Sequence, residues 1–459
     1  MSRIVIIGGG LSGLTAAYWL ATAGFETIVL EASNNFGGNT KTARLGPFLS
    51  ELGEAHFDDT PKTLRNLCAE LGLEVQTSPD HRTVVRLNGQ DWVLPPQLNL
   101  TSGFGLSQLA ELPFGPGVRW RLKTERFVAS TSVKDEPLSA FFRRRLGPEI
   151  WRVLEPYLST MLGGAAEDVS APVAFGRLVE LERHGGLLAG SRRLTSSGKL
   201  GLAGGMGSLV EALSKQLLHK ARLLPNHEVW ALTRDSSGWQ IYLRGNKLEA
   251  QAVIVALPAP KAAKVFRPTA PQLTTLLNHF PHQHGAKVFL LYRHVELSVQ
   301  PGVYFFAQGE GFTCSAIKVY RQSDLSCIPP NAEALSPLAP QPLTLPNDGS
   351  ALLELHFIGE VARSADSELT RLAQQNAAQY LQTKAHPLAA WVFRQPHSRP
   401  QFTPGHGRRV TELDRELVHA PGLFLTGSYL AGPGLANLVE HSRLTAHLAL
   451  DYLLQSAAN

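Results

Sequence analysis

Hydrophobic residues near the start of the chain form two short runs that flank a longer segment rich in Ala and Leu. Residues 4–7 are all β-branched aliphatics, which is typical of a strand buried on both faces of a parallel sheet. The Ala- and Leu-rich segment that ends at Gly24 predicts a helix, and the apolar run 27–30 predicts a second strand. This strand–helix–strand order predicts an α/β fold with a Rossmann-like beginning.

Glycines fill the turn between the first strand and the helix. Residues 8–13 read GGGLSG and satisfy the GxGxxG pattern, in which Gly8 permits a tight turn, Gly10 lets the backbone approach a pyrophosphate and Gly13 lets the helix pack on the strand. An acidic residue, Glu31, ends the second strand 18 residues later, where a carboxylate accepts from ribose hydroxyls and disfavours the 2′-phosphate of NADP. The expected contacts with a dinucleotide are Gly8, Gly9, Gly10, Leu11, Ser12, Gly13 and Glu31.

Two further segments favour FAD over NAD. A second glycine pair at 37–38 lets the chain double back along the pyrophosphate, which NAD dehydrogenases do not need. Near the C-terminus, the apolar run 423–425 leads through glycines into a helix that starts near Leu435, so another helix N-terminus is available to an anionic ring edge. The expected FAD contacts in these segments and in the ELGEAHF stretch at 51–57 are Gly38, Asn39, Gly53, Glu54, Ala55, His56, Gly427, Pro433, Gly434 and Leu435.

Several stretches give the chain a family resemblance. They are GGNTKT at 37–42, FGRLVELE at 175–182, GGMGSL at 204–209, RPQFTPGH at 399–406 and GSYLAG at 427–432. On these motifs the chain resembles the FAD-dependent amine-oxidase-type superfamily and, within it, the protoporphyrinogen oxidases. The resemblance spans most of the chain and keeps the family order.

Two regions depart from the family pattern. The resemblance is weakest between residues 280 and 395, where the Pro-rich stretch 329–346 looks like an enlarged loop. Near the C-terminus, Glu440-His441-Ser442 replaces the family's Glu-Ser-Gly. The flavin motifs are intact, so these departures are expected to affect the binding of the substrate and not that of FAD.

The resemblance implies a reaction and some of its binding residues. The reaction is oxidation of a porphyrinogen, protoporphyrinogen IX or coproporphyrinogen III, to the porphyrin in heme biosynthesis, by hydride transfer to N5 of FAD with O2 or a quinone as final acceptor. By resemblance, Val229 contacts the adenine through its backbone, and Arg82 or Arg86 lies near the substrate's propionates. The pattern identifies no catalytic residue.

Three alternatives remain open. One is another oxidase of the amine-oxidase superfamily, although no Cys follows Cys327 for covalent flavin attachment. Another is a carotenoid-type desaturase, which the divergent region 280–395 leaves possible. The last is a non-catalytic flavoprotein that carries FAD without turnover.

The motifs predict a discontinuous architecture. With 459 residues, the chain is long enough for about three folding units. The fold class expected is α/β, with a Rossmann-like FAD-binding domain, an α+β substrate domain and a small helical domain that, as the resemblance implies, faces the membrane. The expected limits are 1–75, 196–280 and 405–459 for the FAD-binding domain, 76–110 and 281–404 for the substrate domain, and 111–195 for the helical domain.

Charge is concentrated in one stretch. The net charge is +5, and residues 119–145 hold eight basic and three acidic residues, so this stretch alone equals the whole excess (8 − 3 = 5). It is either a solvated helix face or a surface for anionic lipid heads or an acidic substrate, and Trp120 and Phe127 within it are either interface anchors or packing residues. No nucleic-acid motif accompanies it, so no nucleic-acid partner is expected.

Composition narrows the compartment and the chemistry. A hydrophobic share of 44% and a charged share of 18% exclude a disordered or coiled-coil protein. Cys68, Cys314 and Cys327 lie far apart without a CxxC motif, which predicts neither a disulfide framework nor a metal site. No signal peptide and no run of 18 apolar residues occurs, so we expect a cytoplasmic monomer or homodimer whose membrane contact, if any, is peripheral.

Overall fold

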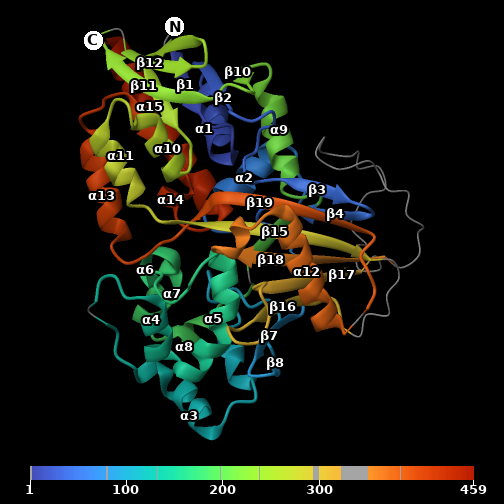
Figure 1. Ribbon diagram of the computed structural model, residues 1–459. Helices are drawn as coiled ribbons and strands as arrows, with labels where there is room; N and C mark the ends of the chain where they lie inside the picture. The colour runs from blue at the N-terminus through green and yellow to red at the C-terminus, as the bar shows by residue number, and fades with distance from the viewer. Residues whose placement is uncertain are drawn as a thin grey trace.

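The computed structural model describes residues 3–78, 81–131, 133–196, 198–236, 238–292, 299–321, 350–382 and 384–458. The stretch 329–346, expected to be an enlarged loop, and Cys327 lie outside these ranges. Figure 1 shows a five-stranded sheet with its helices at the end of the molecule that carries both termini, a helical unit at the opposite end, and a seven-stranded sheet between them.

The five-stranded sheet is parallel throughout and draws its strands from distant parts of the sequence. Its order is β10-β2-β1-β14-β20. The strands are β1 (Arg3–Ile7), β2 (Glu26–Leu30), β10 (Ala221–Leu224), β14 (Ala252–Val255) and β20 (Leu423–Leu425). The apolar run at 4–7 serves both faces, because Ile4 and Ile6 pack on one side and Val5 and Ile7 on the other.

Helices and a small sheet cover the two faces. On the Ile4 side lie α1 (Leu11–Thr22), α2 (Thr63–Glu70), α9 (Gly207–Leu217) and α15 (Leu435–Ala458). On the Val5 side lie the antiparallel strands β11 (Val229–Asp235), β12 (Gly238–Leu243) and β13 (Asn246–Ala250), with α10 (Ala259–Phe266), α11 (Pro271–Asn278), α13 (His406–Leu417) and α14 (Ser428–Ala431). The strands β5 (Phe57–Asp58), β6 (Val75–Thr77) and β9 (Lys199–Leu202) form a further sheet in the order β5-β9-β6.

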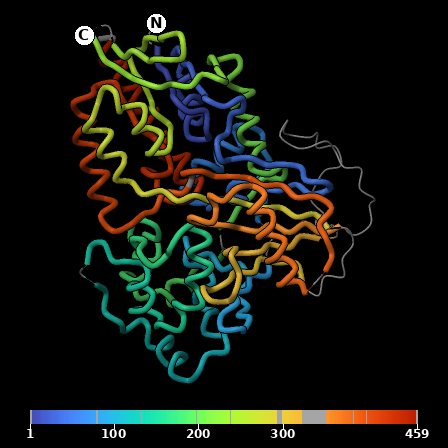
Figure 2. Tube along the Cα trace, in the orientation of Figure 1, coloured from blue at the N-terminus to red at the C-terminus, as the bar shows by residue number. Residues whose placement is uncertain are grey.

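The seven-stranded sheet is mainly antiparallel, in the order β19-β15-β18-β17-β16-β7-β8. Its strands are β7 (Thr83–Leu87), β8 (Gln90–Val93), β15 (His282–Tyr292), β16 (Gly302–Phe306), β17 (Ala316–Arg321), β18 (Ala351–Ile358) and β19 (Ala389–Pro400), and only β16 and β7 pair in parallel. Figure 2 shows the long strands β15 and β19, coloured yellow and orange, running side by side as their register requires. Residues far apart in the sequence therefore meet on each face of one sheet.

One face of this sheet is apolar and is covered by α12 (Asp366–Leu381). Alternate residues such as Val288, Leu290, Leu353, Leu355 and Ile317 point to this side and pack on the helix. The opposite face is termed here the inner face. At one end it packs through Phe289 and Leu352 on the hairpin β3 (Thr42–Leu45) and β4 (Phe48–Glu51), and at the other end it packs on the helical unit.

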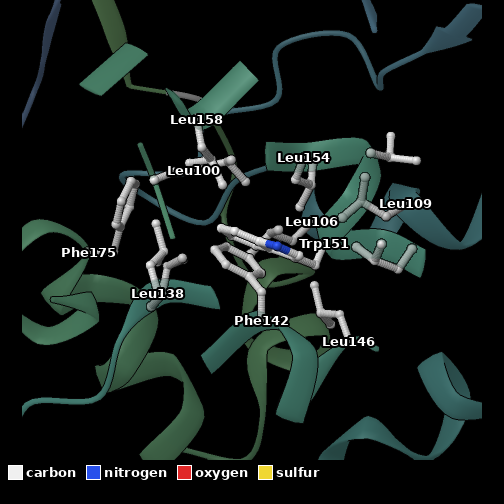
Figure 3. Packing of buried hydrophobic residues seen from close by; sticks show 14 of the residues in the cluster. Leu100, Leu106, Leu109, Leu138, Phe142, Leu146, Trp151, Leu154, Leu158 and Phe175 are labelled. Carbon is white, nitrogen blue, oxygen red and sulfur yellow. The ribbon is translucent and has the colours of Figure 1, made fainter. Parts of the chain in front are cut away.

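The helical unit, residues 106–191, has an apolar core of its own. Its elements are η1 (Leu106–Glu111), α3 (Pro116–Thr124), η2 (Glu125–Phe127), α4 (Leu138–Arg145), α5 (Pro148–Leu162), α6 (Ala171–Ala174), α7 (Gly176–Arg183) and α8 (Leu187–Ser191). Figure 3 shows Trp151 stacked on Phe142, with ring centroids 6.1 Å apart, among leucines of several helices. No helix in the described ranges is long and apolar enough to cross a membrane.

Part of the basic stretch 119–145 lies inside this unit. The Arg145 guanidinium is 1% exposed and pairs with the equally buried Glu125, and Arg144 bonds Glu136 at 2.7 Å and Glu182 at 2.6 Å. Neither reading of the stretch, solvated face or lipid surface, anticipated these internal ion pairs. The remaining surface cations are Arg119, Lys123, Arg126, Lys134 and Arg143.

Candidate functional site

The first glycine turn has the close contacts that its sequence requires. Gly8 adopts a φ of +108°, and a Cβ on it would lie 2.5 Å from the carbonyl oxygen of Ala256 in the turn after β14. A Cβ on Gly13 would lie 1.9 Å from the Gly8 oxygen, so only glycine lets α1 begin this close to β1. Leu11 and Ser12 form the first turn of α1 behind it.

The second glycine pair lies directly against this turn. Gly37 N–H donates to the Gly9 oxygen at 2.8 Å, and the Gly10 and Gly37 backbones form a bridge. Among the described residues, and apart from its neighbours in the chain, a Cβ built on Gly10 would have only the Cα of Gly38 within 4 Å, at 3.8 Å. This open backbone beside the N-terminus of α1, whose cap makes no side-chain hydrogen bond, suits a pyrophosphate.

Glu31 supports the same turn from the end of β2. Its Oε2 accepts from Gly9 N–H at 2.8 Å, and its Oε1 accepts from the N–H and hydroxyl of Ser33 at 2.8 and 2.7 Å. Its half-buried carboxylate retains acceptor capacity for a ribose hydroxyl. Val229, predicted to lie at the adenine, is buried at the start of β11, and His227 N–H just before it donates to the Glu31 carbonyl at 2.8 Å.

The ELGEAHF loop meets the N-terminus of α15. A Cβ on Gly53 would lie 2.0 Å from the oxygen of Asn39, so this loop passes against the segment after the second glycine pair. Solvent reaches the Glu54 side chain, but the surrounding protein still raises its pKa, while the backbone N–H of Leu435 works in the opposite direction, which places the Glu54 carboxylate at the start of α15. Gly434 there has a φ of +93° and open space around it. The predicted segments 8–13, 37–39, 53–56 and 434–435 thus converge, and Gly427 and Pro433 belong to the turn between β20 and α15.

Ala55 and His56 follow in the same loop and are exposed to solvent. The pKa of His56 is nonetheless lowered to about 3, first by the surrounding protein and then by Lys199 and Lys318. Solvent therefore reaches His56, although protein atoms and cations surround it. We interpret His56 as facing the interior of the site and not the outer surface. His56 is therefore neutral at pH 7 and sits in a positive field.

A buried hydroxyl cluster that sequence reasoning missed ties α1 to α15. Ser12 Oγ lies 2.6 Å from Ser442 Oγ and 3.1 Å from Thr426 Oγ1, which also lies 3.0 Å from His441 Nδ1. Two of these residues belong to the Glu440-His441-Ser442 departure. That departure therefore provides polar contacts between the two helices whose N-termini face the site.

A second missed group lies in the middle of the inner face of the seven-stranded sheet. Lys287 Nζ of β15 donates to the carbonyls of Glu51 and Gly53 at 2.9 and 3.0 Å and pairs with Glu354 of β18 at 2.7 Å. Glu354 also lies 3.0 Å from His356 Nε2 and accepts from the Tyr320 hydroxyl at 2.7 Å. We call Lys287, Lys318, Tyr320, Glu354 and His356 the polar strip.

The polar strip fixes the loop that carries the predicted flavin contacts. Burial alone would raise the pKa of Glu354, but Lys287 and His356 hold it well below its ordinary value, so this carboxylate is ionised. The Lys287–Glu354 pair thereby holds the Gly53 carbonyl in place. The signal in the sequence was a single charge inside each apolar strand, AKVFLLY and ALLELHFI.

Glu51 links the same loop to the glycine-rich turn before α9. Its carboxylate accepts from Met206 N–H at 2.7 Å and from Thr42 Oγ1 at 2.8 Å. Burial raises its pKa from 4.5 to about 7, and Lys287 only partly opposes that rise. The carboxyl is thus half-ionised near neutral pH.

The two predicted substrate arginines lie elsewhere. On β7, Val85 points to the inner face and Val84 to the α12 face, so Arg86 and Arg82 share the side of Val84. Arg86 lies 3.4 Å from Asp91 and 3.8 Å from Glu310, and Arg82 donates to Gln300. This placement does not bring either arginine to the convergent loops, and their contact with substrate stays a prediction.

The family profile described as flavin-containing amine oxidoreductase matches residues 11–446, which include every convergent segment except the first glycines. This chain belongs to that family. As a flavin-containing amine oxidoreductase it is an FAD-dependent enzyme, so the predicted cofactor, enzyme class and mixed α/β fold class are confirmed.

Relatives cover nearly the full chain. The chain is 26% identical over 502 residues to coproporphyrinogen III oxidase of Bacillus subtilis, covering 98% of both proteins. It is 26% identical over 489 residues to human protoporphyrinogen oxidase, covering 96% of this chain and 97% of the relative. These matches confirm the resemblance to protoporphyrinogen oxidases predicted from the motifs.

Solved structures agree on the fold. A protein from Exiguobacterium sp. 255-15, provisionally named a protoporphyrinogen oxidase, superposes with a TM-score of 0.80 at 20% identity over 98% of this chain and 99% of its own. Cyclohexylamine oxidase from Brevibacterium oxydans gives a TM-score of 0.66 at 18% identity over 99% of each chain. The amine oxidoreductase fold is therefore shared across different substrates.

Proposed function

We propose that this FAD-dependent enzyme oxidises a porphyrinogen, protoporphyrinogen IX or coproporphyrinogen III, to the porphyrin in heme biosynthesis. The observation that carries the proposal is the end-to-end match with relatives named for both activities. The cations that surround His56 at the convergent loops also support it, because a porphyrinogen carries propionate groups.

The convergent segments are the proposed FAD contacts. Residues 8–13 and 37–39 would cradle the pyrophosphate, Glu31 the adenosine ribose, Val229 the adenine, and residues 53–56 and 434–435 the isoalloxazine ring. When bound, FAD supplies a two-electron acceptor at N5 that O2 or a quinone reoxidises.

The chain's own residues then bind, orient and exclude water. Aromatisation of the macrocycle drives the reaction, so no strong nucleophile is needed. Lys287 fixes the carbonyls of Glu51 and Gly53 in the loop that would hold the ring, and the apolar residues next to the polar strip, which include Phe305 and Tyr157, would suit the macrocycle. We assign the seven-stranded sheet to the substrate domain with the predicted limits 76–110 and 281–404, and the interrupted five-stranded unit to the FAD-binding domain.

The helical domain, 111–195, is the proposed site of a peripheral contact with anionic membranes. Trp120 and Phe127 are 69% and 72% exposed, and Arg126 lies 4.6 Å from the Phe127 ring. Cosedimentation with vesicles of anionic and of neutral lipid tests this contact. Binding to neither overturns it and supports a cytoplasmic enzyme without membrane attachment.

The reaction is tested with purified protein whose absorption spectrum confirms bound FAD. Each porphyrinogen is supplied separately in air and then with a quinone, and porphyrin fluorescence is followed against protein-free and FAD-free controls. An FAD-dependent rise supports the proposal, and the faster substrate identifies the reaction. Bound FAD with no rise on either substrate and either acceptor overturns the proposal and favours a desaturase or a non-catalytic flavoprotein.

A further inference from the structure

One cation of the polar strip has no anionic partner. Lys318 lies on β17, opposite Glu354 on one side and Val303 on the other, and its Nζ lies 4.6 Å above the Tyr320 ring. Within the part of the chain that the structure describes, no carboxylate oxygen lies within 4 Å of this ammonium. Glu354, the nearest acid on the strip, is already bonded by Lys287, His356 and Tyr320.

The environment makes this lack of a partner costly. Lys318 is half-buried, and desolvation lowers its pKa despite the attraction of Glu354, with Lys287 adding repulsion. A desolvated ammonium without a hydrogen-bonded anion is unfavourable, and ionisable groups perturbed in this way cluster at functional sites.

Lys318 lies at the border between the charged residues and the apolar residues of the inner face. On one side lie the Lys287–Glu354 pair and the exposed His56 of the loop at 53–56. On the other side lie Val303 and Phe305 of β16, and Tyr157 of α5 packs edge-on against Phe305 with centroids 5.1 Å apart. A ligand with a large apolar body and a peripheral carboxylate matches both sides.

Arg399, another cation near the loop at 53–56, has a different explanation. Its NH1 donates to the carbonyls of Thr160 and Met161 at 3.3 and 2.9 Å, at the end of α5. A guanidinium at a helix C-terminus stabilises the unpaired carbonyls there. Arg399 therefore has a structural role at the end of α5. Lys318 lies on a strand and not at a helix end, so the same role does not apply to it.

We propose that Lys318 binds a carboxylate of the substrate and orients the macrocycle over the loop at 53–56. The inference rests on the proposed function and deepens it, since it names the residue that recognises a propionate. Lys318 acts as a positioning residue for the substrate, and it replaces Arg82 and Arg86 as the expected partner of the acid.

The test measures binding separately from turnover. Holoenzyme is titrated with protoporphyrin IX and with its dimethyl ester, which lacks the free carboxylates, and porphyrin fluorescence gives each Kd. The variants are Lys318→Met, the charge-retaining Lys318→Arg, and the control Lys215→Met, whose side chain is exposed on α9. We expect the preference for the acid over the ester to fall about tenfold in Lys318→Met, as for loss of one charged hydrogen bond, and to be retained in the other two.

The melting temperature provides a second readout, because loss of a purely structural residue would lower it. Because the ammonium is desolvated and unpaired, we expect Lys318→Met to raise the melting temperature of the ligand-free holoenzyme while it weakens acid binding. If Lys318→Met lowers the melting temperature or leaves the acid preference unchanged, Lys318 is not the carboxylate site. If the wild-type enzyme still oxidises a porphyrinogen, only the assignment of Lys318 has failed. If it does not, the proposed function has failed.

Discussion

The two faces of the seven-stranded sheet show how one set of strands serves two purposes. Toward α12, the buried residues in the central parts of β15, β17 and β18 are apolar, as Leu353 and Leu355 illustrate. On the inner face, the same strands carry Lys287, Lys318 and Glu354 between two apolar ends. A shift of one residue along β18 exchanges a fully buried leucine for a charge.

The comparison teaches where the fold tolerates ionised groups. The centre of the α12 face is packed with apolar side chains, so its contribution to stability comes from burial. On the inner face, Lys287 pairs with Glu354 and with two loop carbonyls, whereas Lys318 has no carboxylate oxygen within 4 Å among the described residues. The charged centre of this otherwise apolar face is the side to which we assign the proposed substrate.

The largest expected effect comes from placing a charge on the α12 face. Leu353 is fully buried, and Leu353→Asp should destabilise the protein by more than about 4 kcal/mol, because the new carboxylate would have no partner. Denaturant unfolding measures the change, and Leu353→Met, which conserves volume, should cost less than about 1.5 kcal/mol. A cost for Leu353→Asp as small as that of the control would mean that the two faces do not differ as described.

Breaking the ion pair on the inner face should cost nearly as much. Lys287→Met leaves Glu354 and two loop carbonyls without their cation, and the expected loss is about 3–5 kcal/mol. The double variant Lys287→Met/Glu354→Met should be more stable than Lys287→Met alone, since no uncompensated charge remains. Additive losses in the unfolding free energies would show that the pair is not coupled.

Glu51 should give the inner face a pH dependence that the α12 face lacks. Its folded-state pKa of about 7 lies above the ordinary 4.5, so the folded protein holds its proton over that interval and loses stability as pH rises through it. The stability of Glu51→Gln relative to wild type should therefore increase by about 3 kcal/mol between pH 4.5 and 7 and level off above. The exposed Glu111→Gln should follow the wild-type profile in the same unfolding series.

The smallest effect is expected at Arg86. Because it lies on the α12 side and pairs with Asp91 and Glu310, Arg86→Ala should change KM for a porphyrinogen by less than about twofold, as for a surface ion pair. Steady-state kinetics compare it with Lys318→Met, whose KM should rise by about tenfold. A larger rise in KM for Arg86→Ala than for Lys318→Met would return the propionate contact to the predicted arginine.

The sequence by itself determined the nucleotide turn. Its geometry is mostly local, since GGGLSG between a strand and a helix specifies the contact of Gly13 with the Gly8 oxygen, whereas the contact of Gly8 with Ala256 depends on the pairing of β14. Glu31 was likewise predictable, because a parallel βαβ unit fixes where the second strand ends. The family motifs extended this reading to FAD and to the remaining convergent segments.

Only the tertiary structure decided the faces of the seven-stranded sheet. Val84 and Val85 are both apolar, so periodicity did not say which of them points to α12. The face on which Arg86 lies depends on this choice. The sequence likewise did not show the internal partners of Arg144 and Arg145 in the basic stretch, because Glu136 and Glu182 contact these arginines only when the helices pack together. The polar strip joins strands more than 30 residues apart, and such pairings follow from register and packing rather than from local pattern.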